Sequence, residues 1–307
     1  MYVLRTENIN KTYKGKKVLS DVNINVSEGD IYGFVGENGA GKTTLIRIIT
    51  GLINFDSGSY SLFEVKNTDK DFNIQKKKIG GIVETVSLIR NMNALENLKF
   101  QCMITDIEKS DDELIALIDK VGLNYEEIKK KKVGNFSLGM RQRLGIAVIM
   151  VSDPKFIVLD EPMNGVDPQG MIDIRNTILT LNQEGVTFLI SSHILSELEK
   201  ICTKVGMISQ GKMVCEMDLE EFRRKSRKHT VIKCVDHNDN EKVVNLLINN
   251  LGLSEVNIEN NNVCIFDDVD VNVLMKLLVN NDINIENINV NNDTIEDFYI
   301  KVMGGEK

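Results

Sequence analysis

Apolar and polar positions alternate in short runs over the first 35 residues of the chain. Residues 2–4, 12–19 and 22–26 have the pattern of short strands, and the last of these runs alternates strictly between apolar and polar side chains. A turn at residues 27–30 leads into the fully apolar run 31–35. The pattern predicts an antiparallel β lead-in that ends in a buried strand.

Strand-like and helix-like patterns alternate over the middle of the chain. Apolar runs at residues 77–84, 156–159 and 186–190 are expected to form buried strands, and residues 204–218 have the pattern of a hairpin. Helical periodicity is expected at residues 94–132, 138–151 and 169–181. This alternation predicts an α/β fold whose apolar strands share one parallel sheet.

Residues 230–303 differ in character, because they are rich in asparagine and poor in aromatic side chains. Asparagine bias alone would favour disorder, but the apolar periodicity favours a folded module. Its pattern predicts strand, helix, strand, strand, helix and strand, followed by a closing helix at residues 294–303. The order β-α-β-β-α-β is that of a small ferredoxin-like unit. No catalytic constellation is visible in it.

Length and charge limit the possible partners. A chain of 307 residues with 42% hydrophobic content can bury a large core and has room for a second, small domain. The formal net charge of −8 argues against a nucleic-acid partner, since binding to phosphate backbones depends on clustered basic residues. No run of 18 apolar residues occurs. Any role at a membrane is therefore expected to depend on a partner.

Three segments are expected: a domain at residues 1–218, a basic connector at residues 219–229, and an accessory α+β domain at residues 230–307. The connector carries five basic residues and is expected to be a solvated helix, with contact to anionic lipid or a partner as the alternative. These residues are Arg223, Arg224, Lys225, Arg227 and Lys228.

The candidate chemistry begins after the strand at residues 31–35. The chain there reads Gly36-Glu37-Asn38-Gly39-Ala40-Gly41-Lys42-Thr43-Thr44, a G-x-x-x-x-G-K-[ST] pattern followed by an apolar helix. Glycines let the backbone turn with its amides inward, so the loop and the helix start can hold phosphate oxygens. Lys42 adds a charge toward the β- and γ-phosphates, and the Thr43 hydroxyl can bind Mg²⁺. The flanking strand and helix disfavour the alternative of a glycine-rich turn without a ligand.

Further candidates lie at element boundaries. Asp160 and Glu161 follow a buried strand, where Asp160 can hold Mg²⁺ and Glu161 can polarise an attacking water, rather than cap a turn. Ser137 has the place of a helix N-cap, so this helix start is either an anion site or a plain cap. His193 ends the next strand, in either a structural or a catalytic role. Tyr13 precedes the turn at residues 14–16 and could lie on an adenine ring, although residue type alone favours ordinary strand packing.

These segments together resemble the ATP-binding cassette subunit of membrane transporters. The resemblance covers about residues 2–218 and rests on the phosphate loop 36–44, the signature-like Ser137-Leu138-Gly139-Met140-Arg141-Gln142, the acidic strand 156–162, the loop 164–167 and His193. It implies a P-loop NTPase cassette with an antiparallel β subdomain and a helical subdomain. It also implies that Tyr13 stacks on adenine, which reverses the expectation from residue type. The segment 293–299 resembles the accessory tail of drug and peptide exporters.

The resemblance implies roles for named residues in a closed pair of cassettes. Ser137 and Gly139 of one subunit would contact the γ-phosphate held by the other, and Glu161 and His193 would be catalytic. The metal ligands would be Thr43, Asp160 and Glu84. The full set of implied ATP contacts is Tyr13, Gly36, Asn38, Gly39, Ala40, Gly41, Lys42, Thr43, Thr44, Ser137, Gly139 and Asp167.

Two positions depart from the common cassette pattern. The signature reads Phe136-Ser137-Leu138-Gly139-Met140 where many cassettes have LSGGQ, so Ser137 and Gly139 are kept. Glu84 stands where most cassettes have glutamine. A glutamate there is similar to bacterial exporters that confer immunity to lantibiotics and bacitracin-like peptides. Glu84 would bring a third carboxylate, a harder ligand than an amide, near Mg²⁺ and the water. The alternative is a neutral exchange.

The function expected from the resemblance is an ATPase, dependent on ATP and Mg²⁺, that drives an exporter of antimicrobial peptides. Export of another drug, lipid or ion is the alternative, and a soluble cassette ATPase without a transport role is less favoured. The expected partners are a second cassette subunit, identical or different, and transmembrane permease subunits that dock on residues 84–97. The expected location is the cytoplasmic face of the cell membrane, with contact only through the permease and none with nucleic acid.

Overall fold

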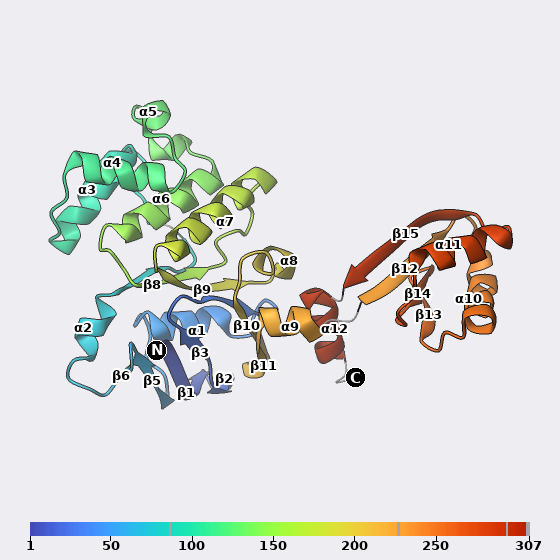
Figure 1. The fold of residues 1–307 in the computed structure, drawn as a ribbon. Coiled ribbons are helices and arrows are strands. Elements are labelled where there is room, and N and C mark those ends of the chain that lie inside the picture. Colours follow the sequence, from blue (N-terminus) through green and yellow to red (C-terminus); the bar gives the residue numbers. More distant parts are fainter. Residues whose placement is uncertain (86, 226–227, 293, 305–307) are drawn as a thin grey trace. The chain divides into compact units, whose positions relative to one another are not determined.

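A computed structural model describes residues 1–85, 87–225, 228–292 and 294–304. The chain separates into two compact units, Met1–Glu220 and Glu221–Lys307 (Figure 1). Each unit has a hydrophobic cluster of its own. The division follows a change in sequence character, since the asparagine-rich part of the chain lies in the second unit.

The first unit opens with an antiparallel sheet. Its strands are β1 (Tyr2–Tyr13), β2 (Lys16–Val22), β3 (Asn25–Ser27), β5 (Ser57–Leu62) and β6 (Val65–Lys66), in the order β2-β1-β5-β6 with β3 also paired to β1. The prediction of separate strands at residues 2–4 and 12–19 was wrong. One strand runs through residues 2–13, and the chain reverses at Lys14 and Gly15, whose φ angles of 47° and 82° suit a tight hairpin.

The predicted strand at residues 22–26 is also interrupted. The Thr6 hydroxyl donates to the carbonyl of Val22 (3.1 Å) and accepts from the amide of Ile24 (2.9 Å). The Thr6 amide also donates to the carbonyl of Ile24 (3.0 Å), so this residue links the end of β2 to the start of β3, which are separate strands. The alternation of apolar residues could not reveal this, because it depends on a threonine from the neighbouring strand.

A mainly parallel sheet lies at the centre of the first unit. Its strands are β4 (Ile31–Val35), β7 (Ile79–Ile82), β8 (Phe156–Asp160), β9 (Thr187–Ser192), β10 (Lys204–Ser209) and β11 (Lys212–Asp218), in the order β11-β10-β4-β9-β8-β7. All neighbours are parallel except β10 and β11, which form the predicted hairpin. The carboxyl ends of β4, β8 and β9 are therefore adjacent, and all three are followed by candidate site residues.

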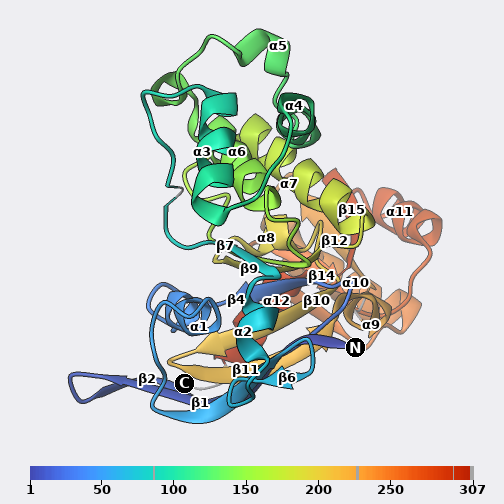
Figure 2. The same ribbon diagram turned by 90° about the vertical axis from the view of Figure 1, so that its left-hand side faces the viewer.

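Helices cover both faces of this sheet. Helices α6 (Leu138–Met150) and α7 (Pro168–Gln183) lie on one side, and α1 (Lys42–Ile49) lies on the other (Figures 1 and 2). Apolar residues of α1, including Leu45 and Ile46, pack with the antiparallel sheet and with Phe34 and Phe156 of the parallel sheet. The phosphate-loop helix is therefore fixed between the two sheets. The short helices α2 (Phe72–Lys76) and α8 (Leu195–Leu198) complete the unit.

The helical stretch predicted at residues 94–132 is three helices, α3 (Ala94–Thr105), α4 (Asp111–Lys120) and α5 (Tyr125–Ile128), followed by a 3-10 turn (Val133–Asn135). The breaks have local causes. Asn93 and Ser110 each form a capping box with a glutamate three residues later, so new helices begin there. Together with α6, these helices make the helical subdomain expected from the resemblance.

The second unit contains a four-stranded antiparallel sheet. The strands β12 (Lys228–Cys234), β13 (Val256–Glu259), β14 (Asn262–Ile265) and β15 (Ile285–Asn292) follow the order β13-β14-β12-β15. Helices α10 (Asp239–Leu251) and α11 (Val271–Asn280) supply Leu247, Leu274 and Leu278 to its core. Both the element order and the strand order are those of a ferredoxin-like unit, as predicted.

Helix α9 (Leu219–Lys225) precedes this sheet, and α12 (Ile295–Gly304) follows it. The connector was expected to be helical through residue 229, but β12 begins at Lys228 because Lys228 and His229 pair with the end of β15. Arg227 of the predicted connector and Asp293 of the predicted tail lie outside the described residues. Among the helices described, none has the length and hydropathy needed to span a membrane.

Candidate nucleotide-binding site

The phosphate loop joins β4 to α1, as its sequence predicted. Gly41 precedes the helix with a φ of 112° and, lacking a side chain, cannot cap it. The first amides of α1 therefore keep the polarity that attracts phosphate oxygens. A pocket of about 220 Å³ opens at this point. Its lining comprises Val18, Glu37, Asn38, Gly39, Gly41, Lys42, Thr43, Thr44 and Glu161.

Two glycines of the loop are required by close contacts. A Cβ at Gly36 would lie 2.4 Å from the backbone oxygen of Ile208, and a Cβ at Gly41 would lie 2.7 Å from the Leu19 side chain. Ala40 is buried, and its carbonyl accepts a hydrogen bond from the amide of Gly211 (3.0 Å). The loop is thus held from behind by the β2 and β10–β11 segments.

Lys42, Glu161 and His193 form a continuous polar chain across the pocket. The Lys42 ammonium is 5% exposed and lies 3.3 Å from Oε1 of Glu161. It also donates to the carbonyls of Gly36 (2.5 Å) and Glu37 (3.2 Å). The other carboxylate oxygen of Glu161 lies 2.9 Å from Nδ1 of His193. The structure thus brings together three residues that lie 32 or more positions apart in the sequence. Glu161 and His193 meet because they follow the neighbouring strands β8 and β9.

Ser191 is a member of this site that the sequence analysis missed. Its hydroxyl donates to Oδ1 of Asp160 at 2.5 Å, and the hydroxyl and carbonyl of Ser191 both accept from the amide of Glu161, at 3.0 and 3.2 Å. Glu161 has a φ of 50°, an uncommon conformation for a non-glycine residue. Ser191 therefore fixes the bend that directs Glu161 toward Lys42. Its only signal in the sequence is a polar residue at the end of an apolar strand.

These residues fit a nucleoside triphosphate with Mg²⁺. Gly41 leaves the first amides of α1 without a side-chain cap, and Lys42 is a buried cation whose anionic partner here, Glu161, can be exchanged for phosphate. The Thr43 hydroxyl and the Asp160 carboxylate are hard oxygen donors of the kind that Mg²⁺ prefers. No group of three or more acidic, histidine or cysteine side chains suited to a metal occurs among the described residues. Phosphate oxygens and water are the further ligands that Mg²⁺ commonly takes.

Glu84 lies elsewhere in this structure. It follows β7 with a φ of 64°, and its carboxylate forms an ion pair with the guanidinium of Arg47 in the last turn of α1. Glu84 is absent from the lining of the phosphate-loop pocket. The sequence gives no signal that Arg47 is its partner. Both side chains are substantially exposed, at 37% for Arg47 and 56% for Glu84, so the pair is free to rearrange.

Ser137, Gly139 and Asp167 form a second group, at the start of α6 and α7. Ser137 is exposed and caps α6 by accepting from the amide of Met140 (3.1 Å). Asp167 is exposed at the start of α7 and makes no side-chain cap there. Gly139 is buried, and a Cβ on it would lie 3.2 Å from Cα of Gly170, so it lets the two helices approach closely. None of the three lines the phosphate-loop pocket of the same chain.

Tyr13 lies at the end of the β1–β2 hairpin and is 40% exposed. Its strand partner is Lys16, and Val18 of the same hairpin lines the phosphate-loop pocket. One face of the ring is covered by the Lys11 ammonium, which lies 5.2 Å from the ring centre. Tyr13 itself is not among the residues that line this pocket.

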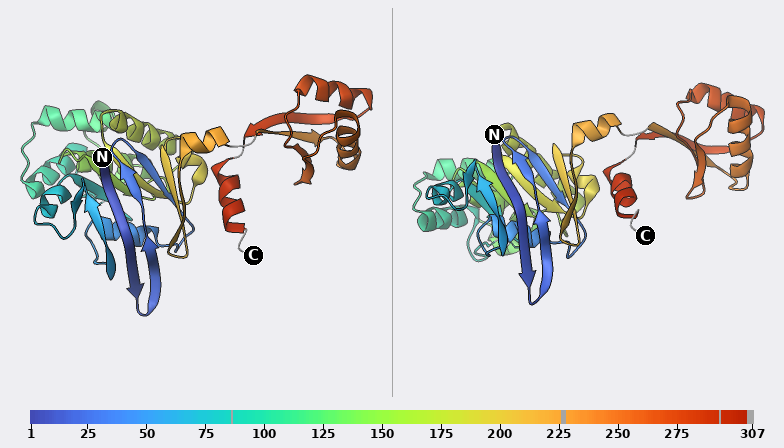
Figure 3. Two further views of the ribbon diagram at one scale, coloured as in Figure 1. Left: turned by 60° about the horizontal axis from the view of Figure 1, so that its bottom comes forward. Right: turned by 90° about the horizontal axis from the view of Figure 1, so that it is seen from below.

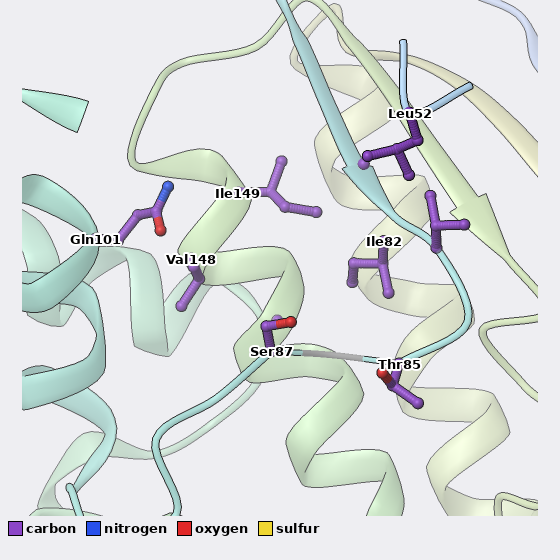
Figure 4. A pocket seen from close by; sticks show the side chains of 10 residues that line it. Leu52, Ile82, Thr85, Ser87, Gln101, Val148 and Ile149 are labelled. Atoms are coloured by element: carbon purple, nitrogen blue, oxygen red, sulfur yellow. The ribbon is translucent and has the colours of Figure 1, made fainter. Parts of the chain in front are cut away.

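A second pocket lies between β7, α3 and α6 (Figure 4). It has a volume of about 300 Å³, and Figure 4 shows Leu52 and Gln101 on opposite sides of it. Val83, Thr85 and Ser87 come from the segment that was predicted to dock a permease. The lining combines apolar side chains with a few polar ones, a composition suited to a protein segment.

A phosphate loop on a mainly parallel sheet, with carboxylates at the end of a neighbouring strand, defines a P-loop nucleoside triphosphatase. The family described as ABC transporter matches residues 19–164. The bacitracin transport ATP-binding protein BcrA of Bacillus licheniformis is 38% identical over 99% of this chain and 98% of its own length. The lantibiotic transport ATP-binding protein SrtF of Streptococcus pyogenes is 40% identical over 71% of this chain and 92% of its own.

Solved structures show the same likeness. An ATP-binding cassette of an ABC transporter in its ADP conformation is 30% identical, with a TM-score of 0.65, over 72% of this chain and 92% of that one. A dimeric bacterial ABC transporter cassette is 25% identical, with a TM-score of 0.62. The match covers 70% of this chain and 98% of the cassette. The chain belongs to the ABC transporter family, as an ATP-binding cassette with ATPase activity.

Proposed function

We propose that this cassette drives an exporter that removes antimicrobial peptides of the bacitracin or lantibiotic kind. The observation that carries the proposal is the likeness to the bacitracin protein, which extends over 99% of the chain and therefore includes the second unit. The lantibiotic protein matches only 71% of the chain. We take bacitracin-like peptides as the first cargo to test. In this proposal residues 1–218 are the ATPase domain, and the basic connector joins them to an accessory domain at residues 230–307.

Within the ATPase domain, each side chain has a proposed task. The loop amides and Lys42 hold the β- and γ-phosphates, with Asn38, Gly39, Ala40 and Thr44 shaping the loop. Glu161 orients the attacking water and takes its proton, and His193 holds Glu161 and reaches toward the γ-phosphate. Mg²⁺, when bound, supplies charge neutralisation at the phosphate oxygens. Thr43, Asp160 and, after leaving Arg47, Glu84 are the residues proposed to hold it.

We propose that two copies of the chain form the complete site. Ser137, Gly139 and Asp167 lie outside the phosphate-loop pocket of their own chain, and Ser137 and Asp167 are exposed. A helix start that faces another surface can bind phosphate from that surface. The γ-phosphate would then bridge the two chains, and its hydrolysis would remove the bridge.

The transmembrane partner is proposed to dock in the pocket of Figure 4. Its lining includes Val83, Thr85 and Ser87, which adjoin Glu84, and the helices α3 and α6. A permease segment seated there would hold the cassette on the cytoplasmic face of the cell membrane. A cysteine introduced at Ser87 should therefore cross-link to the permease, whereas capture only at distant positions would argue against this site.

Deletion of the chain tests the cargo. We expect a host that lacks it to become more sensitive to bacitracin and lantibiotics, with unchanged sensitivity to antibiotics that act inside the cell. The wild-type chain should restore resistance, and Glu161→Gln should not. Unchanged sensitivity to both peptide classes, in a host where the chain and its permease are expressed, would contradict the proposed cargo but leave the ATPase assignment intact.

A further inference from the structure

The β1–β2 hairpin carries a lysine whose surroundings differ from those of its neighbours. Lys14, Lys16 and Lys17 are exposed at its tip, but the Lys11 side chain is only 14% exposed. The Lys11 ammonium lies 3.2 Å from Oδ1 of Asp56 and 5.2 Å from the centre of the Tyr13 ring. A partly desolvated cation over an aromatic face is attracted to that face.

Asp56 holds this part of the hairpin through three bonds. Its carboxylate accepts from the Thr12 amide at 2.6 Å and from Lys11, and its own amide donates to the carbonyl of Asn10 at 2.9 Å. Desolvation acts to raise the pKa of this carboxyl, but the Thr12 and Lys11 bonds outweigh it and hold the pKa of Asp56 below its usual range. The carboxylate thus stays charged at neutral pH.

Asp56 lies at the point where the antiparallel sheet narrows from three strands to two. Strand β5 pairs with β1 only as far as Asn10, which is opposite Ser57. Beyond that point β1 and β2 continue as a two-stranded ribbon, the projecting hairpin in Figure 3. A two-stranded ribbon is only marginally stable alone. Asp56 lies directly before Ser57 and therefore clamps the ribbon where the third strand ends.

The ribbon also leads directly to the phosphate loop. Lys11 pairs with Leu19 and Thr12 pairs with Lys17, so Val18 is an extra residue in a β-bulge. Val18 lines the phosphate-loop pocket, and its carbonyl is the second-nearest atom, at 3.1 Å, to a Cβ built on Gly41. A tilt of the ribbon would therefore move Tyr13 relative to the loop.

We propose that Lys11 and Asp56 are positioning residues for nucleotide binding: Lys11 covers one face of the Tyr13 ring, and Asp56 anchors Lys11 and the ribbon, so that the other face is presented to the base of ATP. The inference rests on the proposed stacking of Tyr13 on adenine. It assigns no contact between either residue and the nucleotide. Their effect should appear only for ligands that contain a base.

Two ligands of the full-length chain separate this role from a structural one. ATP has phosphates and a base, whereas inorganic tripolyphosphate has phosphates alone. We expect Lys11→Ala and Asp56→Asn to raise KM for ATP about fivefold with kcat nearly unchanged, since a cation–π contact and its anchor are lost. Tyr13→Ala should raise KM about tenfold, because stacking on the base is removed. The inhibition constant of tripolyphosphate should stay unchanged in all three variants.

Matched variants complete the test. Lys17→Ala removes the same charge from the same hairpin and should leave KM unchanged, whereas Lys11→Arg retains both contacts and should restore the wild-type KM. The inference is overturned if Lys11→Ala leaves KM for ATP unchanged while Tyr13→Ala raises it, or if binding of tripolyphosphate weakens equally. If Tyr13→Ala itself has no effect, stacking fails and this inference fails with it, whereas the proposed export function is untouched.

Discussion

The ammonium of Lys42 lies 3.3 Å from Oε1 of Glu161, so the proposed phosphate-binding cation and the proposed general base form an ion pair. The two groups come from different elements at the same edge of the parallel sheet, because Lys42 begins α1 and Glu161 follows β8. A lysine that moves to phosphate must leave Glu161. ATP binding and this ion pair therefore compete for one charge.

The first prediction follows from this competition. Glu161→Gln removes the negative charge but keeps the size of the side chain, so ATP affinity should be retained or slightly increased. Turnover should fall by about 100-fold or more, because the general base is lost. Equilibrium ATP binding and phosphate release by the purified variant measure the two effects. Wild-type turnover would refute the role of Glu161 as the base.

His193 provides the second prediction. Its Nδ1 lies 2.9 Å from Oε2 of Glu161, and the two residues follow the neighbouring strands β9 and β8. His193→Ala should lower kcat by about 10-fold or more while KM for ATP changes little, since the proton-transfer group loses its orienting partner. Asn176→Ala, an exposed position of α7 outside the pocket lining, is a suitable control. A change in KM alone would mean that His193 only binds nucleotide.

Arg47 and Glu84 give a third prediction. If Glu84 exchanges Arg47 for the metal, Glu84→Gln should raise the Mg²⁺ concentration needed for half-maximal activity, and Arg47→Gln should lower it or leave it unchanged. Titration of ATPase activity with Mg²⁺ at saturating ATP measures both. Identical curves for wild type and Glu84→Gln would remove Glu84 from the metal site and leave its pairing with Arg47 as its role.

Gly36 gives a prediction about stability. Gly36→Ala places a Cβ 2.4 Å from the Ile208 backbone oxygen, which cannot turn aside as a side chain could. We expect a loss of about 1–3 kcal/mol in the free energy of unfolding, as for other overpacked sites, together with weaker ATP binding. Thermal unfolding and ATP titration measure these effects. Gly185→Ala gives the opposite case, because Gly185 has a φ of 92° and nothing within 4 Å of its Cβ, so its variant has backbone strain without a collision.

The sequence predicted those parts of the site that are contiguous. The phosphate loop, Asp160–Glu161 and His193 each follow an apolar strand, and parallel strands bring such positions to one edge of a sheet. The sequence could not predict that Ser191 bonds to both Asp160 and Glu161. Nor could it predict that Arg47 pairs with Glu84. Such contacts depend on which strands and helices are neighbours. The pairing of Lys11 with Asp56 could not be predicted for the same reason, because the two residues are 45 positions apart in the sequence.

The fold shows the same division between local and distant causes. Apolar periodicity predicted the order of elements in the ferredoxin-like unit and the β10–β11 hairpin. It missed the full length of β1, because the polar residues between Leu4 and Tyr13 form a strand only with β2 and β5 on either side. It also merged α3, α4 and α5, although the capping residues Asn93 and Ser110 were visible.

The central claim is that ATP is hydrolysed at a seam between two copies of the chain, and complementation tests it most directly. Lys42→Ala disables the phosphate loop, and Ser137→Arg blocks the facing helix start, so each variant alone should be inactive. If the sites are shared, an equal mixture of the two, allowed to exchange subunits, should recover about a quarter of wild-type ATPase activity, because half of the dimers would be mixed and each would hold one intact seam of two. A mixture that stays inactive, although the variants dimerise with each other, would contradict the account.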